Sequence, residues 1–428
     1  MTGAEAIAYF DSFYHVVTTP GLHRMRELME RLGNPQDGLR CIHVAGTNGK
    51  GSTCAMLESI LRAARYRTGL YISPHILRFN ERMSCDGEPV TDEELGAVTE
   101  LVKAAAESMD EQCNEFELIT AAAFLFFARQ GCDICVLEVG LGGEFDSTNV
   151  IPAPECALIM NIGMDHMDRL GNTLPEIAAV KAGIIKNGGE AVYYRNTPEV
   201  EAVFEEQAAR VGAKLRGADF GSIRVHRSDI FGQVFDCAGF EDLHTPLIGA
   251  HQLRNTAVVL ECVKVLRERD WSISDEAVHT GIGEVYWPVR FELVDRDPLF
   301  IIDGGHNSQC LTAVTESLNT LLPGRRVVFL TGVLADKDVA EMAKLLDVEA
   351  GAEYVTLTPD SPRAMTAEKL AEYLTREQHV AAEPCADIPA GIARAKELAG
   401  KDGVVCCIGS LYLAGEVRRY FPRSPRLK

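Results

Sequence analysis

The 428-residue sequence lacks an excess of positive charge, since its formal net charge is -20. Nucleic acids and anionic membranes attract proteins mainly through clustered lysines and arginines, so we expect neither as a partner. An anionic substrate must instead be held by local groups of positive potential, such as helix N-termini, a few basic side chains or metal ions.

The sequence also lacks a secretion signal and a long hydrophobic run. Its first residues, MTGAEAIAYFDSFYHV, have no basic start followed by an apolar segment, so we expect no signal peptide. The most apolar stretch, Leu118 to Ala128, is too short to cross a bilayer. Apolar residues make up 46% and charged residues 24%, which is typical of a globular protein. We therefore expect a cytoplasmic protein with two or three domains.

A disulfide framework is not expected either, because the 13 cysteines are odd in number and scattered along a long chain. Cys132 and Cys135 have the spacing of a redox motif. They lie in the apolar run CDICVLEVG, however, which predicts a strand, and residues i and i+3 of a strand point to opposite faces. We interpret the cysteines as reduced thiols. No internal repeat or low-complexity tract is apparent.

Short β-branched or aliphatic runs alternate with amphipathic helical segments. The predicted strands are Cys41–Ala45, Thr68–Ile72, Ile134–Val139, Cys156–Asn161, Leu299–Asp303, Arg326–Thr331, Tyr354–Thr358 and Val404–Ile408. The predicted helices are Ser52–Ala64, Glu117–Arg129, Leu174–Ile185, Gln252–Arg267 and Thr366–Thr375. This alternation predicts parallel sheets with helices packed on their faces.

A domain boundary is predicted near Trp287–Arg290, because a fresh set of strand–helix units follows it. The fold class is therefore α/β. A mostly parallel sheet domain at 1–290, with a β-rich excursion around residues 214–248, precedes a smaller, Rossmann-like α/β domain at 291–428.

The strongest motif follows the strand Cys41–Ala45. There the chain reads Gly46, Thr47, Asn48, Gly49, Lys50, Gly51 and Ser52, and a helical pattern comes next. Glycines let successive N–H groups point at phosphate oxygens, and the helix adds its positive N-terminal end. Lys50 can reach the β- and γ-phosphates, and Ser52 can offer its hydroxyl oxygen to Mg²⁺. The match to the common P-loop pattern is imperfect, since Val44 replaces its first glycine and Gly51 separates Lys50 from Ser52.

That departure is itself informative. GTNGKGS resembles the P-loop variant of the Mur ligase superfamily, in particular of folylpolyglutamate synthase and dihydrofolate synthase. The resemblance extends over nearly the whole chain, in the family's order: GLYISPHILRFNERM, EVGLGGEFDSTNV, NIGMDHMDRLG, KAGIIK, GAHQLRN, WPVRFE, IIDGGHN, GVLADKD and GSLYLA. It implies that 1–290 is an ATP-binding Mur-ligase-type central domain and that 291–428 is a C-terminal glutamate-ligase domain. YISP, DGGHNS and WPVR depart from the family's usual YTSP, DGAHNP and WPGR or WPAR but keep the polar residues.

A metal site is predicted around Glu138, which ends an apolar strand run. Ligands gather at the carboxyl ends of strands in α/β sheets, and a carboxylate there suits Mg²⁺. The resemblance implies two further metal ligands, Ser73 and His166. It also implies that Lys181, in KAGIIK, is carbamylated and holds a second Mg²⁺, which requires an amine that is neutral part of the time. From the residues alone, His166 is more readily interpreted as a surface or structurally satisfied residue, and Lys181 as a solvated lysine on a helix face.

Nucleotide contacts outside the P-loop come from the resemblance alone. Asn255 in the first domain, Arg290 at the domain boundary and Asp303 in the second domain match family residues that contact ATP. His306, Asn307, Asp336 and Lys337 lie in loops after second-domain strands and are candidates for positioning glutamate. For these four, a structural role as a turn or cap is an equal alternative.

The reaction implied is amide synthesis in two stages. A folate-type carboxylate attacks the γ-phosphorus of ATP, and the amine of L-glutamate then attacks the acyl phosphate. Lys50, Lys181, His166 and Glu138 are the predicted catalytic residues. The acceptor stays open between dihydropteroate and a reduced folate such as tetrahydrofolate, and a monomer is expected.

Two alternatives remain. A P-loop ATPase acting as a switch or binding module would turn over nucleotide without glutamate. A cell-wall ligase of the Mur type would carry a nucleotide-sugar domain before the P-loop, and the 45 residues before Gly46 are too few for one.

Overall fold

The computed structural model describes residues 1–16, 19–335 and 337–422. The chain divides into two compact units. The first comprises Met1–Arg224, Asp236–Leu243 and Leu253–Val285, and the second comprises Val225–Phe235, His244–Gln252 and Tyr286–Lys428. The main change of unit thus falls between Val285 and Tyr286, while two short segments of the β-rich excursion join the second unit.

The first unit is built on an eight-stranded sheet in the order β4-β3-β2-β5-β1-β6-β7-β8. Its strands are β1 (Cys41–Ala45), β2 (Thr68–Tyr71), β3 (Met83–Cys85), β4 (Glu88–Pro89), β5 (Ile134–Glu138), β6 (Cys156–Ile159), β7 (Glu190–Tyr193) and β8 (Lys214–Gly217). Strands β2, β5, β1, β6, β7 and β8 run parallel, and the short strands β3 and β4 continue the sheet in antiparallel fashion.

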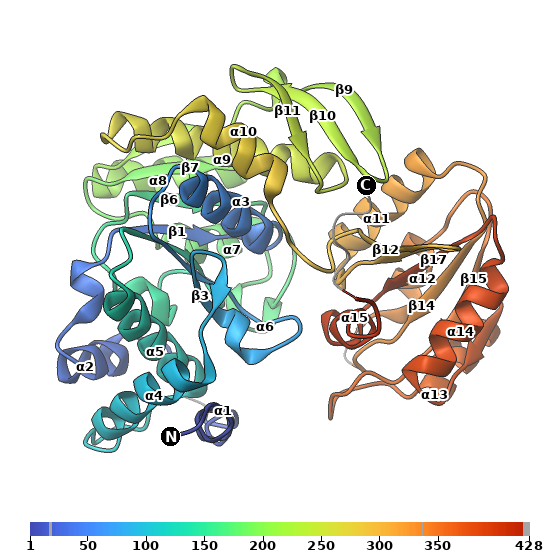
Figure 1. Cartoon of the computed structure of the whole chain (residues 1–428), viewed down its shortest axis with the longest axis horizontal. Helices are drawn as coiled ribbons and strands as arrows, with labels where there is room; N and C mark the ends of the chain where they lie inside the picture. The colour runs from blue at the N-terminus through green and yellow to red at the C-terminus, as the bar shows by residue number, and fades with distance from the viewer. Residues whose placement is uncertain (17–18, 336, 423–428) are drawn as a thin grey trace. The chain divides into compact units, whose positions relative to one another are not determined.

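Helices cover both faces of this sheet (Figure 1), with α3, α9 and α10 on one side and α1, α2, α4 and α5 on the other. The helices are α1 (Gly3–Asp11), α2 (His23–Arg31), α3 (Lys50–Ala63), α4 (Asp92–Ala106), α5 (Glu115–Gln130), α6 (Met167–Leu170), α7 (Leu174–Ala182), α8 (Pro198–Val211), α9 (Ala250–Glu268) and α10 (Asp275–Glu284). Short 3-10 helices are η1 (Pro35–Gly38), η2 (Phe79–Arg82), η3 (Ser147–Val150) and η4 (Phe220–Ser222).

The sequence explains where several helices begin. Helices α4, α5 and α7 each begin with a capping box, at Thr91, Asn114 and Thr173. The side chain of this first residue accepts a backbone N–H of the first turn, and a glutamate three residues later accepts the backbone N–H of the capping residue. All residues of β1, β2, β5 and β6 are buried, as expected for parallel strands covered on both faces.

The second unit contains a six-stranded sheet in the order β12-β13-β17-β14-β15-β16, parallel except for β12. Its elements are β12 (Glu292–Arg296), β13 (Leu299–Ile302), α11 (Ser308–Leu321), β14 (Val327–Thr331), α12 (Val339–Leu345), β15 (Ala352–Thr356), α13 (Ala367–Glu377), β16 (Ala382–Pro384), α14 (Ile388–Ala399), β17 (Val404–Ile408) and α15 (Leu411–Arg418). A three-stranded sheet, β9 (Arg224–Asp229), β10 (Gly232–Cys237) and β11 (Phe240–Thr245), is divided between the two units.

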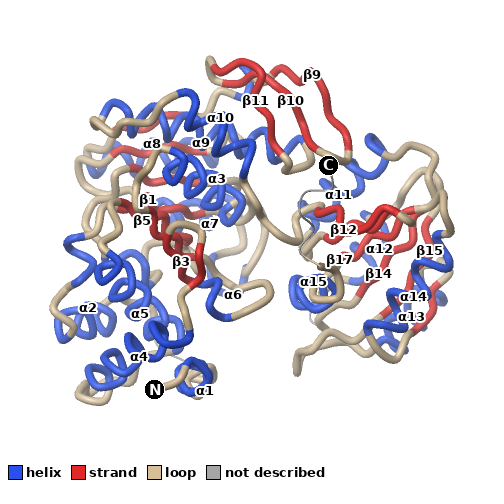
Figure 2. The backbone as a smooth tube through the Cα atoms, in the orientation of Figure 1, coloured by secondary structure: helices blue, strands red, loops and turns tan. Residues whose placement is uncertain are grey.

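The predicted α/β fold with mostly parallel sheets is confirmed, and Figure 2 shows strands and helices alternating along the chain. Each of the eight predicted strands is present. Cys41–Ala45 and Val404–Ile408 have the predicted bounds, whereas Tyr354–Thr358 is displaced to Ala352–Thr356. Within the described residues, no helix is long and apolar enough to cross a membrane.

The prediction that Cys132 and Cys135 lie on opposite faces of one strand was wrong. Strand β5 begins only at Ile134, and Cys132 lies in the turn after α5, where its N–H donates to the carbonyl of Phe127. Strand alternation therefore does not separate Cys132 from Cys135, and Cys135 lies near enough to influence the pKa of the Cys132 thiol.

Candidate functional site

The loop Gly46–Gly49 connects β1 to α3 at the carboxyl edge of the first sheet. Its position is fixed by the loop after β6. The Thr47 N–H donates to the carbonyl of Asn161 at 2.8 Å, and the Thr47 hydroxyl donates to the carbonyl of Gly163 at 3.1 Å. Ser52 lies in the first turn of α3 and is 3% exposed. The loop and the helix N-terminus have the geometry that binds phosphate groups.

Two lysines meet at this loop. The Lys50 ammonium donates to the carbonyls of Gly46 and Thr47 at 3.1 and 3.3 Å. The Lys181 ammonium reaches the same Gly46 carbonyl, at 3.0 Å, from helix α7. Two lysines from helices far apart in the sequence thus converge on one backbone oxygen.

Lys181 is buried, with 4% of its surface exposed. Burial and, to a lesser extent, the nearby charge of Lys50 lower the pKa of Lys181 to about 7, against the opposing effect of Asp165 and Asp146. The interpretation of Lys181 as an ordinary surface lysine is therefore wrong. A substantial fraction of its amine is neutral near pH 7, as carbamylation requires.

The position of Lys181 is set by close backbone packing. A Cβ atom added to Gly143 would lie 2.8 Å from the carbonyl oxygens of both Val180 and Lys181. A Cβ on Gly183 would lie 2.4 Å from the Cβ of Glu144, whose N–H donates to the Val180 carbonyl. The glycine-rich turn after β5 thus lies directly against α7.

Asp146 holds that turn in place. Its carboxylate accepts the N–H groups of Leu141 and Thr148 at 2.9 and 3.0 Å. Thr148 in turn lies 2.8 Å from the Nε2 of His43, a fully buried residue on β1. Burial raises the pKa of Asp146 and lowers that of His43 to about 3. This network ties the turn to the sheet.

Ser73 and Glu138 lie side by side at the ends of β2 and β5. The Ser73 N–H donates to Glu138 Oε2 at 3.2 Å, and Glu138 is 5% exposed. The Ser73 hydroxyl oxygen is buried without a hydrogen-bond partner. Burial raises the pKa of the Cys54 thiol on α3, and the Glu138 charge adds to this effect, which places Glu138 close to α3. A carboxylate beside an unsatisfied hydroxyl is a fitting oxygen donor set for Mg²⁺.

His166 is the most exposed of the candidates. It has a left-handed backbone, with φ of 49°, directly before α6, and its side chain is 57% exposed. Its Nε2 lies 4.0 Å from Asp165 Oδ1. His166 belongs to the same loop that anchors Thr47 through Gly163, and an exposed imidazole there remains accessible to an incoming ligand.

Asn255 on α9 lies against the P-loop and is 3% exposed. Gly49 has φ of 88°, and a Cβ at this position would lie 2.7 Å from the Asn255 Oδ1. Only glycine satisfies both the backbone angle and the close approach. The structure therefore brings Asn255 to the loop that the sequence predicts to bind nucleotide.

In the second unit, Asp303, which follows β13, lies near Arg290, which precedes β12. The Asp303 carboxylate accepts the N–H groups of Phe291 and Gly305 at 2.8 and 2.7 Å, and burial raises its pKa while the Arg290 charge opposes that shift. The Arg290 Nη1 donates to the carbonyl of Val289 at 2.9 Å. Asp303 thus has a structural role within its own loop.

The four candidates for glutamate binding are placed differently. Asn307 is the N-cap of α11, where its Oδ1 accepts the N–H of Cys310 at 3.1 Å. The exposed His306 lies with Nδ1 3.0 Å from the carbonyl of Gly304. The Lys337 N–H donates to the carbonyl of Leu334 in a turn. Asp336 lies outside the described residues.

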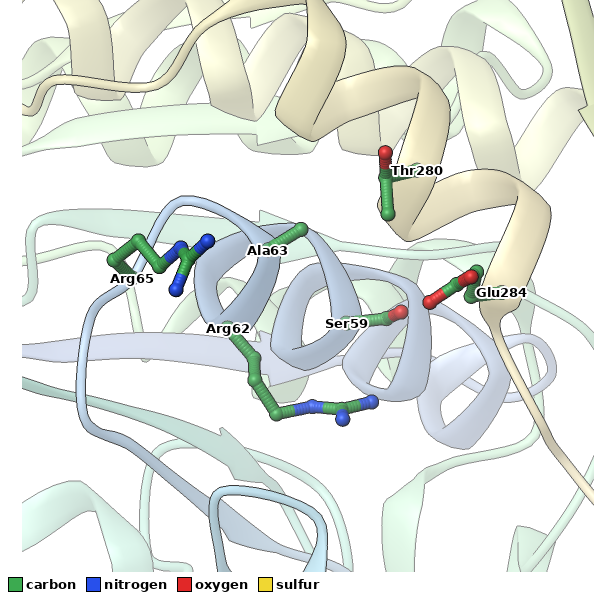
Figure 3. Close-up of a pocket in the computed structure, with 6 residues that line it drawn as sticks. All are labelled: Ser59, Arg62, Ala63, Arg65, Thr280 and Glu284. Carbon is green, nitrogen blue, oxygen red and sulfur yellow. The ribbon is translucent and has the colours of Figure 1, made fainter.

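Several residues of this site were not singled out from the sequence. Asp146, Gly143 and Asn161 stand in the strings EVGLGGEFDSTNV and NIGMDHMDRLG, but nothing in their spacing shows that they support the P-loop and Lys181. A cavity of about 260 Å³ lies elsewhere, between α3 and α10, lined by Ser59, Arg62, Ala63, Arg65, Thr280 and Glu284 (Figure 3). It adjoins the C-terminal end of α3, whereas the P-loop precedes the N-terminus.

Comparison with known proteins adds to this geometry. Residues 44–263 match the Mur ligase middle domain, and residues 289–411 match the Mur ligase glutamate ligase domain. The chain is 38% identical over 411 residues to a dihydrofolate synthase/folylpolyglutamate synthase of Bacillus subtilis, covering 94% of each chain.

Solved structures of the same family are also similar to this chain. The structure resembles Mycobacterium tuberculosis folylpolyglutamate synthase complexed with ADP, with a TM-score of 0.90, 30% identity and 99% coverage of each chain. It also resembles Escherichia coli FolC in complex with DHPP and ADP, with a TM-score of 0.86, 29% identity and coverage of 98% and 97%. The chain therefore belongs to the folylpolyglutamate synthase/dihydrofolate synthase family of the Mur ligases, which are ATP-dependent ligases.

Proposed function

We propose that this protein adds L-glutamate to a folate-type carboxylate at the expense of ATP. The observation that carries the proposal is the convergence of Lys50 and Lys181 on the Gly46 carbonyl of a P-loop. In a P-loop ATPase switch, nothing would require a second, buried lysine at this oxygen. Membership of the family supports the same reaction.

In the first stage the carboxylate of the acceptor attacks the γ-phosphorus of ATP, which gives an acyl phosphate and ADP. This stage brings several anions together, so the residues mainly align and neutralise charge. We assign phosphate binding to Gly46–Ser52. Lys50 leaves the loop carbonyls to reach the phosphates, and Asn255, Arg290 and Asp303 contact the nucleotide.

We assign Mg²⁺ binding to Ser52, Ser73, Glu138, His166 and a carbamate on Lys181, with two ions in all. Bound Mg²⁺ supplies charge neutralisation at the phosphates. The buried, unsatisfied hydroxyl of Ser73 beside Glu138 supports this assignment. The burial of Lys181 beside Lys50 supports the carbamate, because reaction with CO₂ replaces a disfavoured cation by an anion.

In the second stage the amine of glutamate attacks the acyl phosphate, and phosphate leaves. We assign glutamate positioning to His306, Asn307, Asp336 and Lys337 in the domain at 291–428, and nucleotide binding to the domain at 1–290. We further propose that the protein acts in the cytoplasm as a monomer, without a nucleic-acid or membrane partner.

The test measures ADP release by the purified protein with ATP, Mg²⁺ and L-glutamate. Dihydropteroate is offered in one reaction and tetrahydrofolate in another. Turnover that requires both glutamate and a pterin supports the proposal, and the responding reaction identifies the acceptor. Turnover indifferent to both additions would refute the ligase reaction and favour a P-loop ATPase.

A further inference from the structure

Four cysteines of the first unit gather at one place on the sheet, apart from the ligase site. Cys41, Cys85 and Cys135 belong to β1, β3 and β5, and Cys132 lies in the turn before β5. The Cys85 and Cys132 sulfurs are 3.7 Å apart. Cys132 and Cys135 also influence the pKa of one another, and Cys41 raises that of Cys135, so the four thiols lie near one another.

The strand register explains this gathering. Cys41 pairs with Cys135, Cys135 pairs with Gly69 of β2, and Gly69 pairs with Cys85. Residues paired across a ladder point to the same face of the sheet, so the three cysteines and Gly69 form one row. A Cβ on Gly69 would lie 2.9 Å from the Cys135 sulfur. The absence of a side chain at Gly69 therefore leaves room for the sulfurs of neighbouring strands.

Cys132 is the reactive member of this group. Cys132 is partly exposed, whereas Cys85 and Cys135 are buried. The neighbouring thiols of Cys135 and Cys85 lower the pKa of the Cys132 thiol, and the charge of Arg67 acts in the same direction. Cys85 has the opposite shift, since its hydrogen bond with Cys132 and its burial raise its pKa. A partly exposed thiolate next to a second thiol is the arrangement of a nucleophilic and a resolving cysteine.

A cavity of about 320 Å³ is lined by the residues that directly follow the two cysteines. It is lined by Arg62, Arg65, Tyr66, Arg67, Asp86 and Asp133. Asp86 and Asp133 directly follow Cys85 and Cys132 in the sequence, and each binds a backbone N–H at the start of β2. Arg62 is paired with Glu58, and Arg67 donates to Gln130, but Arg65 has no such side-chain partner among the described residues. Arg65 also lines the neighbouring cavity in Figure 3.

We propose that Cys85 and Cys132 form a reversible disulfide by exchange with a small, acidic disulfide that enters this cavity. The Cys132 thiolate attacks one sulfur of R–S–S–R, forming a mixed disulfide and releasing RS⁻. Cys85 then loses its proton, and its sulfur attacks the Cys132 sulfur and releases the second RS⁻. The two protein sulfurs are oxidised and one small disulfide is reduced. The proton that Cys85 loses and the one that Cys132 gave to solvent on ionising end on the two RSH molecules.

The bond requires only a short movement. An S–S bond is about 2.05 Å long, so the sulfurs approach from 3.7 Å by side-chain rotation. The disulfide would connect the end of β3 to the turn before β5 and so fasten the short antiparallel edge of the sheet, which β3 and β4 form, to its interior.

The experiment incubates the full chain with glutathione disulfide, followed by alkylation, intact mass measurement and peptide mapping. We expect the oxidised chain to carry two fewer alkyl groups than the reduced chain, and a peptide that links Cys85 to Cys132, both reversed by dithiothreitol. In Cys85→Ser, which lacks the resolving thiol, a stable mixed disulfide should accumulate on Cys132. Cys132→Ser should show neither product.

The matched control is Cys385→Ser, since Cys385 is also partly exposed but belongs to the second unit. It should form the Cys85–Cys132 link as the unaltered chain does. Arg65→Gln should slow oxidation by glutathione disulfide and leave the rate with the uncharged hydroxyethyl disulfide unchanged. A link between Cys132 and Cys135, or an unaltered mass in the unmodified chain, would overturn the proposal, and equal slowing with both reagents would refute the docking role of the cavity.

Discussion

Lys181 in the first unit and Asp303 in the second are both buried charged residues, yet their surroundings differ. Lys181 donates a hydrogen bond to the carbonyl of Gly46, and among the charges that shift its pKa the largest effect comes from another cation, Lys50. Asp303 accepts two backbone N–H groups and lies beside the cation Arg290. The Lys181 ammonium is therefore buried beside a like charge, whereas the Asp303 carboxylate is compensated by groups close to its own loop.

The difference separates two reasons for burying a charge. A compensated charge such as Asp303 organises the backbone around it, so its removal should affect folding as well as activity. A poorly compensated charge costs stability, and its retention indicates a function. The comparison therefore predicts opposite effects of substitution on stability at the two positions.

The largest effect is expected for Lys181→Ala. Ligase activity should fall at least ~100-fold, which corresponds to about 2.7 kcal/mol of transition-state stabilisation, because the proposed carbamate is lost. ATP should still bind to the P-loop, and short carboxylic acids should restore part of the turnover. Steady-state kinetics and nucleotide titration measure these quantities. Unchanged activity would remove the carbamate from the mechanism.

Lys181→Met keeps the volume of the side chain but removes its charge. The folded-state pKa of Lys181 lies near 7, below its ordinary value of 10.5. Between these values the unfolded chain binds the proton and the folded chain does not, so the free energy of unfolding of the native protein should rise with pH from 7 to 10.5. Lys181→Met should lack this component, up to about 1.4 kcal/mol per pH unit. Urea unfolding in CO₂-free buffer measures it, and parallel pH profiles for the two proteins would contradict the burial effect.

Asp303→Ala tests the compensated charge. The N–H groups of Phe291 and Gly305 would lose their acceptor, and each buried, unsatisfied group costs roughly 1–3 kcal/mol. We expect the second unit to unfold at a lower denaturant concentration and ATP affinity to fall. Unaltered stability would mean that Asp303 is as uncompensated as Lys181, and the comparison would fail.

Glu138→Gln removes one charge and keeps the shape. If Glu138 and Ser73 hold Mg²⁺, the Mg²⁺ concentration for half-maximal activity should rise about tenfold, with a smaller rise for Ser73→Ala. Glu144→Gln, in the neighbouring turn, is a matched carboxylate control and should leave the Mg²⁺ titration unaltered. An unaltered titration for Glu138→Gln would contradict its role as a ligand.

The smallest effect is expected for Asn307→Ala. Loss of the N-cap of α11 should lower stability by about 1 kcal/mol. Asn307→Ser retains a capping group and should restore the stability. If Asn307 also positions glutamate, the KM for glutamate should remain raised in Asn307→Ser. A normal KM for glutamate in Asn307→Ser would show that Asn307 caps α11 and does not position glutamate.

Much of the fold follows from local pattern. Strand Cys41–Ala45 was predicted with its observed bounds because a continuous apolar run ends at Gly46, where the chain must turn. The position of Cys132 was predicted wrongly because it lies two residues before β5, in the turn that ends α5. The alternation of side chains between the two faces of a strand does not extend to such a turn.

The site was predicted less completely. The P-loop carries its own signal, but the burial of Lys181 and the cap formed by Asn307 depend on tertiary packing. The row Cys41, Cys135, Gly69 and Cys85 requires the register of three strand pairs, which the sequence alone does not supply.

The close packing of Gly143 and Gly183 has a consequence for redesign of this protein. The placement of Lys181 depends on the absence of side chains at these two positions, since the turn of Gly143 and Glu144 lies directly against the C-terminal end of α7. Exchanging residues that line the acceptor site would leave this lysine where it is. A single methyl group at Gly143, by contrast, would push α7 outward and move the amine. Libraries that aim at new acceptor carboxylates can therefore vary the surrounding side chains freely, provided that these two glycines are left untouched.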